Sequence, residues 1–98
     1  MSTSPSAPVN LIAVIPCPGD NLLQVRQLLD QYGEHVRSMD GTERFEVYQN
    51  RDASEIIVLE RYRDDDAFAE HLADPENAVL NDRLAELTDG GSQLTFLT

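Results

Sequence analysis

Hydrophobic and polar positions along the chain predict a small mixed fold of strands and helices. Four segments are β-rich or alternate between apolar and polar residues, and turn residues bound them. The predicted strands are residues 9–15, 42–50, 54–62 and 93–98. The loop between the second and third strands is short, which makes these two strands a hairpin.

A long amphipathic helix is predicted between the first two strands. Apolar residues recur there at spacings of three and four, which places them on one buried helix face. Asp20 or Asn21 offers an N-cap, and the helix should end before Gly41. The residues of this face are Leu22, Val25, Leu29, Tyr32, Val36 and Met39.

Two shorter helices are predicted after the third strand. The acidic run at residues 64–66 suits the start of a helix over residues 67–73, because carboxylates stabilise a helix N-terminus. Pro75 suits the first turn of a further helix that runs to about Leu87. The apolar set of this last helix is Ala78, Val79, Leu80, Leu84 and Leu87.

The resulting element order is βαββαβ, with the second helix broken before Pro75. This order is typical of the α+β ferredoxin-like fold, in which an antiparallel sheet carries its helices on one face. A chain of 98 residues suffices for one core, so residues 9–98 should form a single domain. Residues 1–8, small and polar, should be a disordered lead-in.

The third predicted strand is apolar on both faces. Ile56 and Val58 share one face, while Ile57 and Leu59 share the other. In a sheet with helices on one side, the far face normally shows polar residues to water. A second copy related by a two-fold axis is the simplest cover for an apolar far face. We therefore expect a homodimer with sheet packed on sheet.

Charge and cysteine content narrow the partners and the compartment. Eighteen Asp and Glu against seven Lys and Arg give a net charge of −11, which disfavours phosphate backbones and anionic lipid. We therefore expect neither nucleic acid nor membrane as a partner. The single cysteine, Cys17, has no second cysteine to pair with, and residues 1–8 lack a signal-peptide pattern, so we expect a cytoplasmic protein.

Candidate chemistry lies on inward faces and not in a known catalytic motif. His35 and His71 fall on different helices without a second ligand at helical spacing, so no metal site is predicted. Glu60 and Tyr62 share the inner face of the third strand, and Phe68 shares one helix side with His71. His71 is a candidate general base, and Tyr62 is a candidate donor to an oxyanion. The structural alternative is a half-buried histidine and a core tyrosine.

Residues 56–75, IIVLERYRDDDAFAEHLADP, resemble the segment that marks the antibiotic biosynthesis monooxygenase (ABM) family. The shared features are a strand ending in Glu-x-aromatic, an acidic helix start, Ala-Phe, a histidine and a break before the next helix. The resemblance extends over residues 9–96. It implies a ferredoxin-like domain that pairs into a dimeric α/β barrel.

This chain differs from the residue patterns of some branches of the family, and these differences indicate which branch it resembles most. The haem-degrading branch has a histidine where this chain has Leu80, and an asparagine near the position of Ile12, so haem degradation is not expected. The polyketide-oxidising branch resembles Asn-x-x-x-Trp along the third strand, where this chain has Val58 and Tyr62. The small quinol-oxidising members share the Glu-x-aromatic and histidine pattern, which matches this chain best.

The resemblance to that group implies a monooxygenase that oxidises a small aromatic or quinol substrate with O₂ and no cofactor. A base removes a proton from the buried phenol, and the anion reacts with O₂ directly in an apolar pocket. His71 and Tyr62 would be the catalytic residues. The expected substrate-binding residues are Glu60, Phe68, Phe45, Tyr48 and His35.

Two alternative functions remain open at this point. A non-enzymatic module of the same fold would bind a small apolar ligand without turnover. An isomerase of the same fold would need a phosphate site. The basic residues near the cleft strands are few, which disfavours the isomerase: Arg44, Arg51, Arg61 and Arg63.

Overall fold

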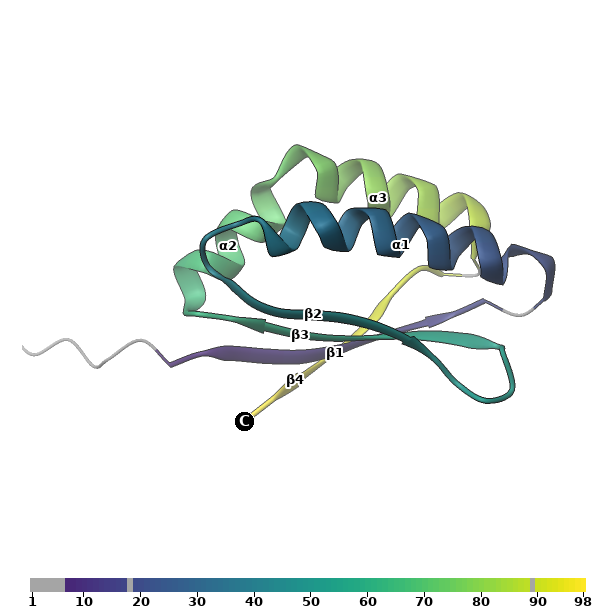
Figure 1. Ribbon diagram of the computed structural model, residues 1–98, viewed down its shortest axis with the longest axis horizontal. Coiled ribbons are helices and arrows are strands. Elements are labelled where there is room, and N and C mark those ends of the chain that lie inside the picture. Colours follow the sequence, from purple (N-terminus) through teal and green to yellow (C-terminus); the bar gives the residue numbers. More distant parts are fainter. Residues whose placement is uncertain (1–6, 18, 89) are drawn as a thin grey trace, which may run out of the picture.

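An antiparallel sheet with a layer of helices on one face makes up the computed structural model (Figure 1). The structure describes residues 7–17, 19–88 and 90–98, so the expectation for residues 1–8 lies largely outside it. The strands are β1 (Val9–Pro16), β2 (Thr42–Gln49), β3 (Glu55–Tyr62) and β4 (Gln93–Leu97). The helices are α1 (Leu22–Arg37), α2 (Asp65–Ala73) and α3 (Pro75–Leu87), with a 3-10 turn at Gly19–Asn21 before α1. The α+β ferredoxin-like fold is confirmed.

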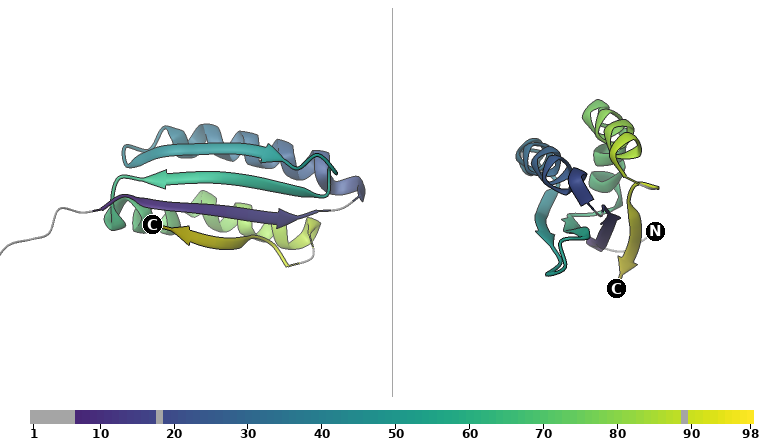
Figure 2. Two further views of the ribbon diagram at one scale, coloured as in Figure 1. Left: turned by 90° about the horizontal axis from the view of Figure 1, so that it is seen from below. Right: turned by 90° about the vertical axis from the view of Figure 1, so that its right-hand side faces the viewer.

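The sheet has the strand order β2-β3-β1-β4, and all neighbouring strands run antiparallel (Figure 2). β3 lies between β2 and β1, and its register sets Glu60 opposite Phe45 on one side and Leu11 on the other. Residues opposite each other in such pairs point to the same face. Glu60 therefore sits in a row of apolar side chains beneath the helices.

Helix α1 packs on this inner face through the residues that its repeat predicted. Val25, Leu29, Tyr32 and Val36 are buried, while the helix ends at Arg37, two residues before Met39. The burial of this one stripe removes a large apolar area from water and supplies much of the packing energy of a small domain.

Helix α3 contributes a narrower apolar stripe than the sequence indicated. Leu80 and Leu84 are buried and one turn apart, but Ala78 and Val79 are exposed. Successive helix residues are about 100° apart, so Val79 cannot face the sheet when Leu80 does. Val79 lines a shallow groove against α1 instead.

The turn after α1 fixes α2 against the end of β3. A Cβ added at Gly41 would lie 2.3 Å from the Cβ of Ala67, so this close approach requires glycine. The Gly41 carbonyl accepts a hydrogen bond from the Arg63 backbone N–H at 2.8 Å, and Asp64 caps α2 by accepting from the Ala67 N–H at 2.8 Å. These contacts hold α2 directly above the end of β3 that carries Glu60.

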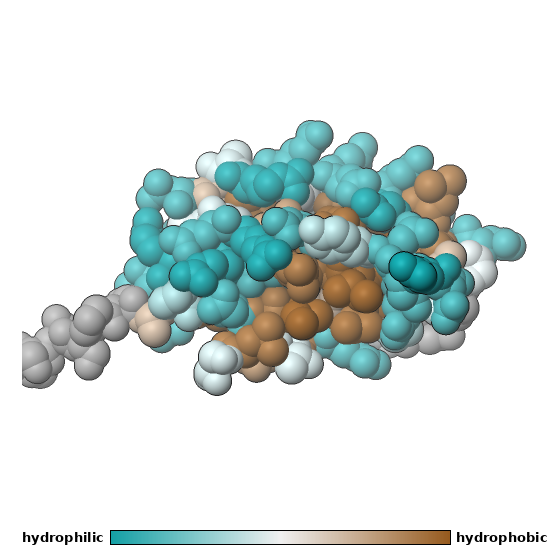
Figure 3. Space-filling view, turned by 60° about the horizontal axis from the view of Figure 1, so that its bottom comes forward, coloured by the Kyte–Doolittle hydropathy of each residue, from teal (hydrophilic) through white to brown (hydrophobic). Residues whose placement is uncertain are grey.

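The outer face of the sheet carries an apolar patch at its centre (Figure 3). Its half-buried members are Ile12 and Val14 on β1 and Ile57 and Leu59 on β3. At its edge, the Arg61 guanidinium reaches Glu43 Oε1 at 2.8 Å. The expectation that the third strand is apolar on both faces is confirmed. Among the described residues, no helix has the length and apolar character needed to cross a membrane.

Candidate functional site

A cavity of about 270 Å³ lies between the sheet and the helices. All four strands and all three helices contribute to its wall, which is mainly aliphatic and aromatic. The polar residues of the wall are Tyr32, Glu60, His71, Asn77, Asn81 and Ser92. Among the described residues, no Lys or Arg lines it. A mostly apolar cavity with a few converging polar groups is typical of a small-molecule site.

Glu60 contributes its carboxyl group to the cavity wall. Tyr62, which does not line the cavity, forms a hydrogen bond with this carboxyl group. The Tyr62 hydroxyl donates a 2.6 Å hydrogen bond to Glu60 Oε1. Tyr62 is fully buried and does not line the cavity, whereas Glu60 does. The structure thus brings the two predicted residues together, but it places the Tyr62 hydroxyl on Glu60 and not on the cavity.

Burial dominates the protonation of this pair. Removal from water disfavours the charged form and raises the pKa of Glu60 to about 7, although the Tyr62 hydrogen bond acts in the opposite direction. Burial, followed by the nearby Glu60 charge, raises the pKa of Tyr62 far above its ordinary value. Near neutral pH the Tyr62 hydroxyl keeps its proton, and the Glu60 carboxyl is divided between its two forms.

His71 faces Glu60 from α2 and is 5% exposed. Its Nε2 atom lies 3.8 Å from Glu60 Oε1, beyond hydrogen-bond distance, and its Nδ1 atom lies 3.4 Å from the Tyr32 hydroxyl oxygen. Burial lowers the pKa of His71 to about 4, against a smaller raising effect of Asp74. The imidazole is therefore neutral at pH 7 and carries one nitrogen lone pair that can accept a proton.

Two aromatic rings lie close to the imidazole ring of His71. The ring centroids of Tyr62 and Phe68 lie 4.8 and 6.1 Å from that of His71, and Phe68 is nearly parallel to it. Phe45 and Phe68 both line the cavity, as the sequence predicted. Together they offer the ring contacts that a planar aromatic ligand needs.

Tyr48 was expected at the site, but the structure places it on the other face of the sheet. It pairs with the outward residue Ile57, is 50% exposed, and donates a hydrogen bond to Glu46 Oε1 at 3.1 Å. The physical reason is strand alternation: Tyr48 is three residues from Phe45, and an odd separation reverses the face.

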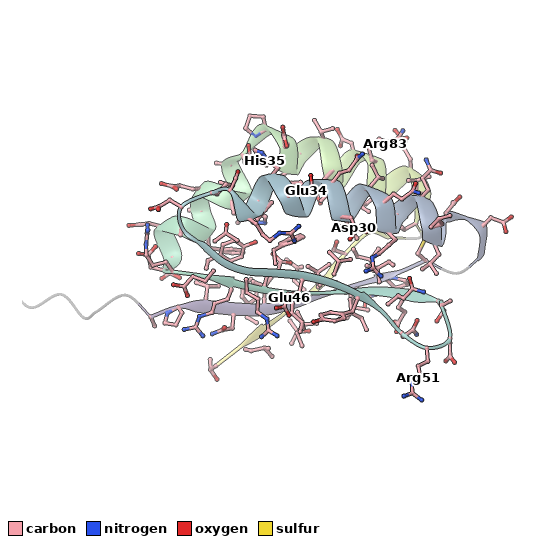
Figure 4. All side chains as sticks on the ribbon, in the orientation of Figure 1. Asp30, Glu34, His35, Glu46, Arg51 and Arg83 are labelled. Carbon is pink, nitrogen blue, oxygen red and sulfur yellow. The ribbon has the colours of Figure 1, made fainter. Side chains whose placement is uncertain are left out.

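His35 also lies outside the cavity wall, in the helical layer (Figure 4). Its Nε2 atom pairs with Asp74 Oδ2, and its Nδ1 atom lies 3.3 Å from Glu76 Oε2. These carboxylates flank the break between α2 and α3. His35 thus links α1 to the helix break, and although its ring centroid lies 6.4 Å from that of Tyr32, it is not part of the cavity wall. No cluster of three or more His, Cys, Asp or Glu suited to a metal occurs in the described part of the chain.

Sequence reasoning missed several polar groups of the cavity. Tyr32 was assigned to the core face of α1, and the asparagines of α3 were not singled out. The available signal was their spacing, because Asn77 and Asn81 each stand three residues before a buried leucine, Leu80 and Leu84. A polar residue at an inward helix position indicates either a hydrogen-bonded core group or a site.

The raised pKa of Glu60 makes stability depend on pH in a predictable direction. Its pKa is about 7 in the folded chain and about 4.5 without the fold. Its contribution to stability is therefore complete below about pH 4.5 and is lost as the pH rises through 7. Glu60→Gln removes this loss, so the free energy of unfolding of the variant should gain about 3 kcal/mol on wild type between pH 4.5 and 8.

Urea unfolding of both proteins across this pH range measures the difference. His71 has the opposite pH dependence, with stability lost as the pH falls toward 4, but it is common to both proteins. Glu70→Gln removes an exposed carboxylate from α2 and controls for the loss of one negative charge. A gain for Glu60→Gln that is the same at every pH contradicts the raised pKa.

The fold and the cavity together define an α+β domain with a mostly apolar cavity between its sheet and its helices. The family model described as antibiotic biosynthesis monooxygenase matches residues 8–80. The chain belongs to this ABM family, as the sequence resemblance indicated.

Relatives in this family share the architecture over nearly the whole chain. A Mycobacterium tuberculosis protein named "Putative monooxygenase Rv0793" is 30% identical over 92 residues, which cover 94% of this chain and 91% of that protein. The solved structure of Rv0793 superimposes with a TM-score of 0.87 and covers 94% of both chains. PA3566 from Pseudomonas aeruginosa, at 22% identity, gives a TM-score of 0.83 over 97% of this chain and 96% of its own.

A more distant structural relative is SnoaB from Streptomyces nogalater, described as a cofactor-independent oxygenase. It is 18% identical, with a TM-score of 0.80 over 93% of this chain and 91% of its own. At this identity the likeness concerns the fold.

Proposed function

We propose that this protein is a cofactor-independent monooxygenase that oxidises a small aromatic or quinol substrate with O₂. The observation that carries the proposal is the neutral imidazole of His71 beside the Glu60 carboxyl, inside an apolar cavity. A buried base of this kind can remove a phenolic proton from a substrate held in a mostly apolar cavity. The monooxygenase name of Rv0793 and the description of SnoaB agree with this chemistry.

The cavity wall favours a neutral substrate. Among the described residues, the wall contains no cation, and Glu60 would repel an anion in its charged form. An electroneutral hydroquinone or anthrone fits these electrostatics, because its rings can contact Phe45 and Phe68. The isomerase alternative requires a phosphate site, which this wall does not offer.

His71 begins the reaction by accepting the phenolic proton on Nε2. The resulting electron-rich anion transfers electrons to O₂, so the substrate is oxidised and O₂ is reduced. One oxygen atom forms a bond to a ring carbon, the O–O bond breaks, and the second oxygen leaves as water with two hydrogens from the substrate. The substrate supplies every electron that O₂ takes up.

Stabilisation of the anion falls to the Glu60–Tyr62 pair. Tyr62 was expected to contact the oxyanion directly, but its hydroxyl is bound to Glu60 Oε1. We therefore assign the donor role to the protonated Glu60 carboxyl, which lines the cavity. Tyr62 positions that carboxyl, and with a pKa of about 7 the carboxyl keeps its proton in part of the molecules near neutral pH and can then donate a hydrogen bond to the anion.

Oxygen uptake with a panel of hydroquinones and anthrones tests the proposal. The purified protein should consume O₂ above the spontaneous rate, with saturation. The rate should be highest between about pH 4, where His71 becomes protonated, and about pH 7, where Glu60 loses its proton. Saturable binding of these compounds without uptake would instead support a non-enzymatic binding module and contradict the enzyme.

We also propose that the working unit is a homodimer joined through the outer sheet face. The central apolar patch with a charged rim resembles the composition of a protein interface. On the edge strand β4, Leu97 pairs with Asn10 on this outer face and is also exposed in the single chain. A contiguous apolar surface of this kind needs a cover, and a second copy supplies an identical one.

A further inference from the structure

A chain of hydrogen bonds runs from the start of α3 to the imidazole of His71. Its first member is Asn77, whose Nδ2 atom donates to the Leu72 carbonyl oxygen at 3.3 Å. A carbonyl oxygen only accepts, so the amide nitrogen must face it. This contact turns Asn77 Oδ1 toward α1. The break between α2 and α3 lies between Leu72 and Asn77, so their hydrogen bond joins the first turn of α3 to the last turn of α2.

Tyr32 is the second member of the chain. Its hydroxyl lies 3.1 Å from Asn77 Oδ1 and 3.4 Å from His71 Nδ1. The hydroxyl has one proton, and Asn77 Oδ1 can only accept, so the proton is donated to Asn77. Burial, together with the nearby carboxylates, raises the pKa of Tyr32, so this hydroxyl remains protonated. Toward His71 it then presents a lone pair.

The third member is His71. The hydrogen bonds of Asn77 and Tyr32 determine which nitrogen of its neutral ring carries the proton. With the Tyr32 proton on Asn77, the 3.4 Å contact between the Tyr32 oxygen and Nδ1 is a hydrogen bond only if Nδ1 carries a proton. A neutral imidazole has a single N–H, which leaves Nε2 with the lone pair. Nε2 makes no hydrogen bond with any described residue and stands 3.8 Å from Glu60 Oε1. The free lone pair is thus on the nitrogen that faces Glu60.

We propose that Asn77, acting through Tyr32, sets the tautomer of His71 with Nδ1 protonated and Nε2 free to accept a proton. This inference rests on the proposed function in one respect, that His71 is the base. Asn77 and Tyr32 are positioning residues in this account. Proton uptake at Nε2 then leaves the Nδ1–H bond to Tyr32 intact, so the ring need not reorient during turnover.

The tautomer can be read from the resting protein by long-range ¹H–¹⁵N correlation spectra of ¹⁵N-histidine-labelled protein at pH 7. The chain contains two histidines, so the spectrum of His35→Gln assigns the signals of His71. We expect His71 of the wild-type protein to show a protonated Nδ1 and an unprotonated Nε2. The reverse pattern overturns the inference without any further variant.

Three variants separate positioning from general structural effects. Asn77→Leu removes the acceptor, so Tyr32 donates its proton to Nδ1 and the tautomer shifts to Nε2–H. Asn77→Asp loses the amide donor to the Leu72 carbonyl but keeps an oxygen acceptor for the Tyr32 hydroxyl, and it should retain the wild-type tautomer. Asn81→Leu is the matched control, because Asn81 lines the same cavity one turn further along α3. An unchanged tautomer in Asn77→Leu contradicts the proposal.

Tyr32→Phe gives a second, independent test if Asn77→Leu does not fold. Loss of the hydroxyl removes the acceptor for the Nδ1 proton, and the Nε2–H population should rise. No substrate is present in these spectra. Absence of O₂ uptake would therefore reject the enzymatic function without affecting the tautomer, and a reversed tautomer would reject the positioning role without affecting the uptake result.

Discussion

Replacing His71 with glutamine lowers the rate of O₂ uptake by roughly 100-fold or more, which is the effect of losing a general base. Glutamine is polar and uncharged, and it has no nitrogen that accepts a proton near neutral pH. The apolar cavity and its ring contacts remain, so substrate binding should weaken far less than turnover. Initial rates with the best compound of the hydroquinone and anthrone panel measure both effects as kcat and KM.

His35→Gln is the matched control for this substitution. It removes the other histidine, which pairs with Asp74 and Glu76 outside the cavity wall. Its rate should stay near that of wild type. An undiminished rate in His71→Gln removes His71 from the role of base, and an equal loss in both variants indicates a structural effect.

A charge on the outer sheet face should dissociate the proposed dimer. In Ile57→Asp, the two-fold axis brings a carboxylate from each chain into the apolar patch, where it finds no partner. Burial of unpaired charges costs several kcal/mol, so we expect the dissociation constant to rise by about 1,000-fold. Sedimentation velocity at micromolar concentration should show a dimer for wild type and a monomer for the variant.

The control for this prediction places the same charge elsewhere. Leu23 on α1 is exposed and lies on the helical side of the molecule, so Leu23→Asp should leave the dimer intact. Circular dichroism of each variant confirms that the fold is kept. Wild-type protein that sediments as a monomer at this concentration would rule out the sheet-to-sheet assembly.

The element order was predictable because each element repeats its apolar residues with its own period. The spacings of three and four along α1 and the alternation in β2 and β3 placed the ends of these elements within three residues of their observed positions. The same alternation places Tyr48 on the face of the sheet opposite to Phe45, which is where the structure has it. The expectation that Tyr48 binds substrate together with Phe45 is therefore wrong, because the two side chains point to opposite faces of the sheet.

The contacts within the site could be predicted only in part. The prediction that Glu60 and Tyr62 share one face of the strand is correct. Periodicity does not show, however, which group accepts the hydrogen bond of the Tyr62 hydroxyl. The Tyr62 hydroxyl binds Glu60, two residues earlier on the same face. The link from Asn77 through Tyr32 to His71 depends on the angle at the α2–α3 break, which no local pattern specifies.

Isotope labelling with ¹⁸O₂ tests the central claim most directly. The purified protein, treated with a chelator and shown to contain no flavin, is supplied with an anthrone or hydroquinone that it consumes. We expect one ¹⁸O atom in each oxidised product molecule and the other in water. Product formed by the protein without ¹⁸O, or uptake that ends when a metal or flavin is removed, would contradict it.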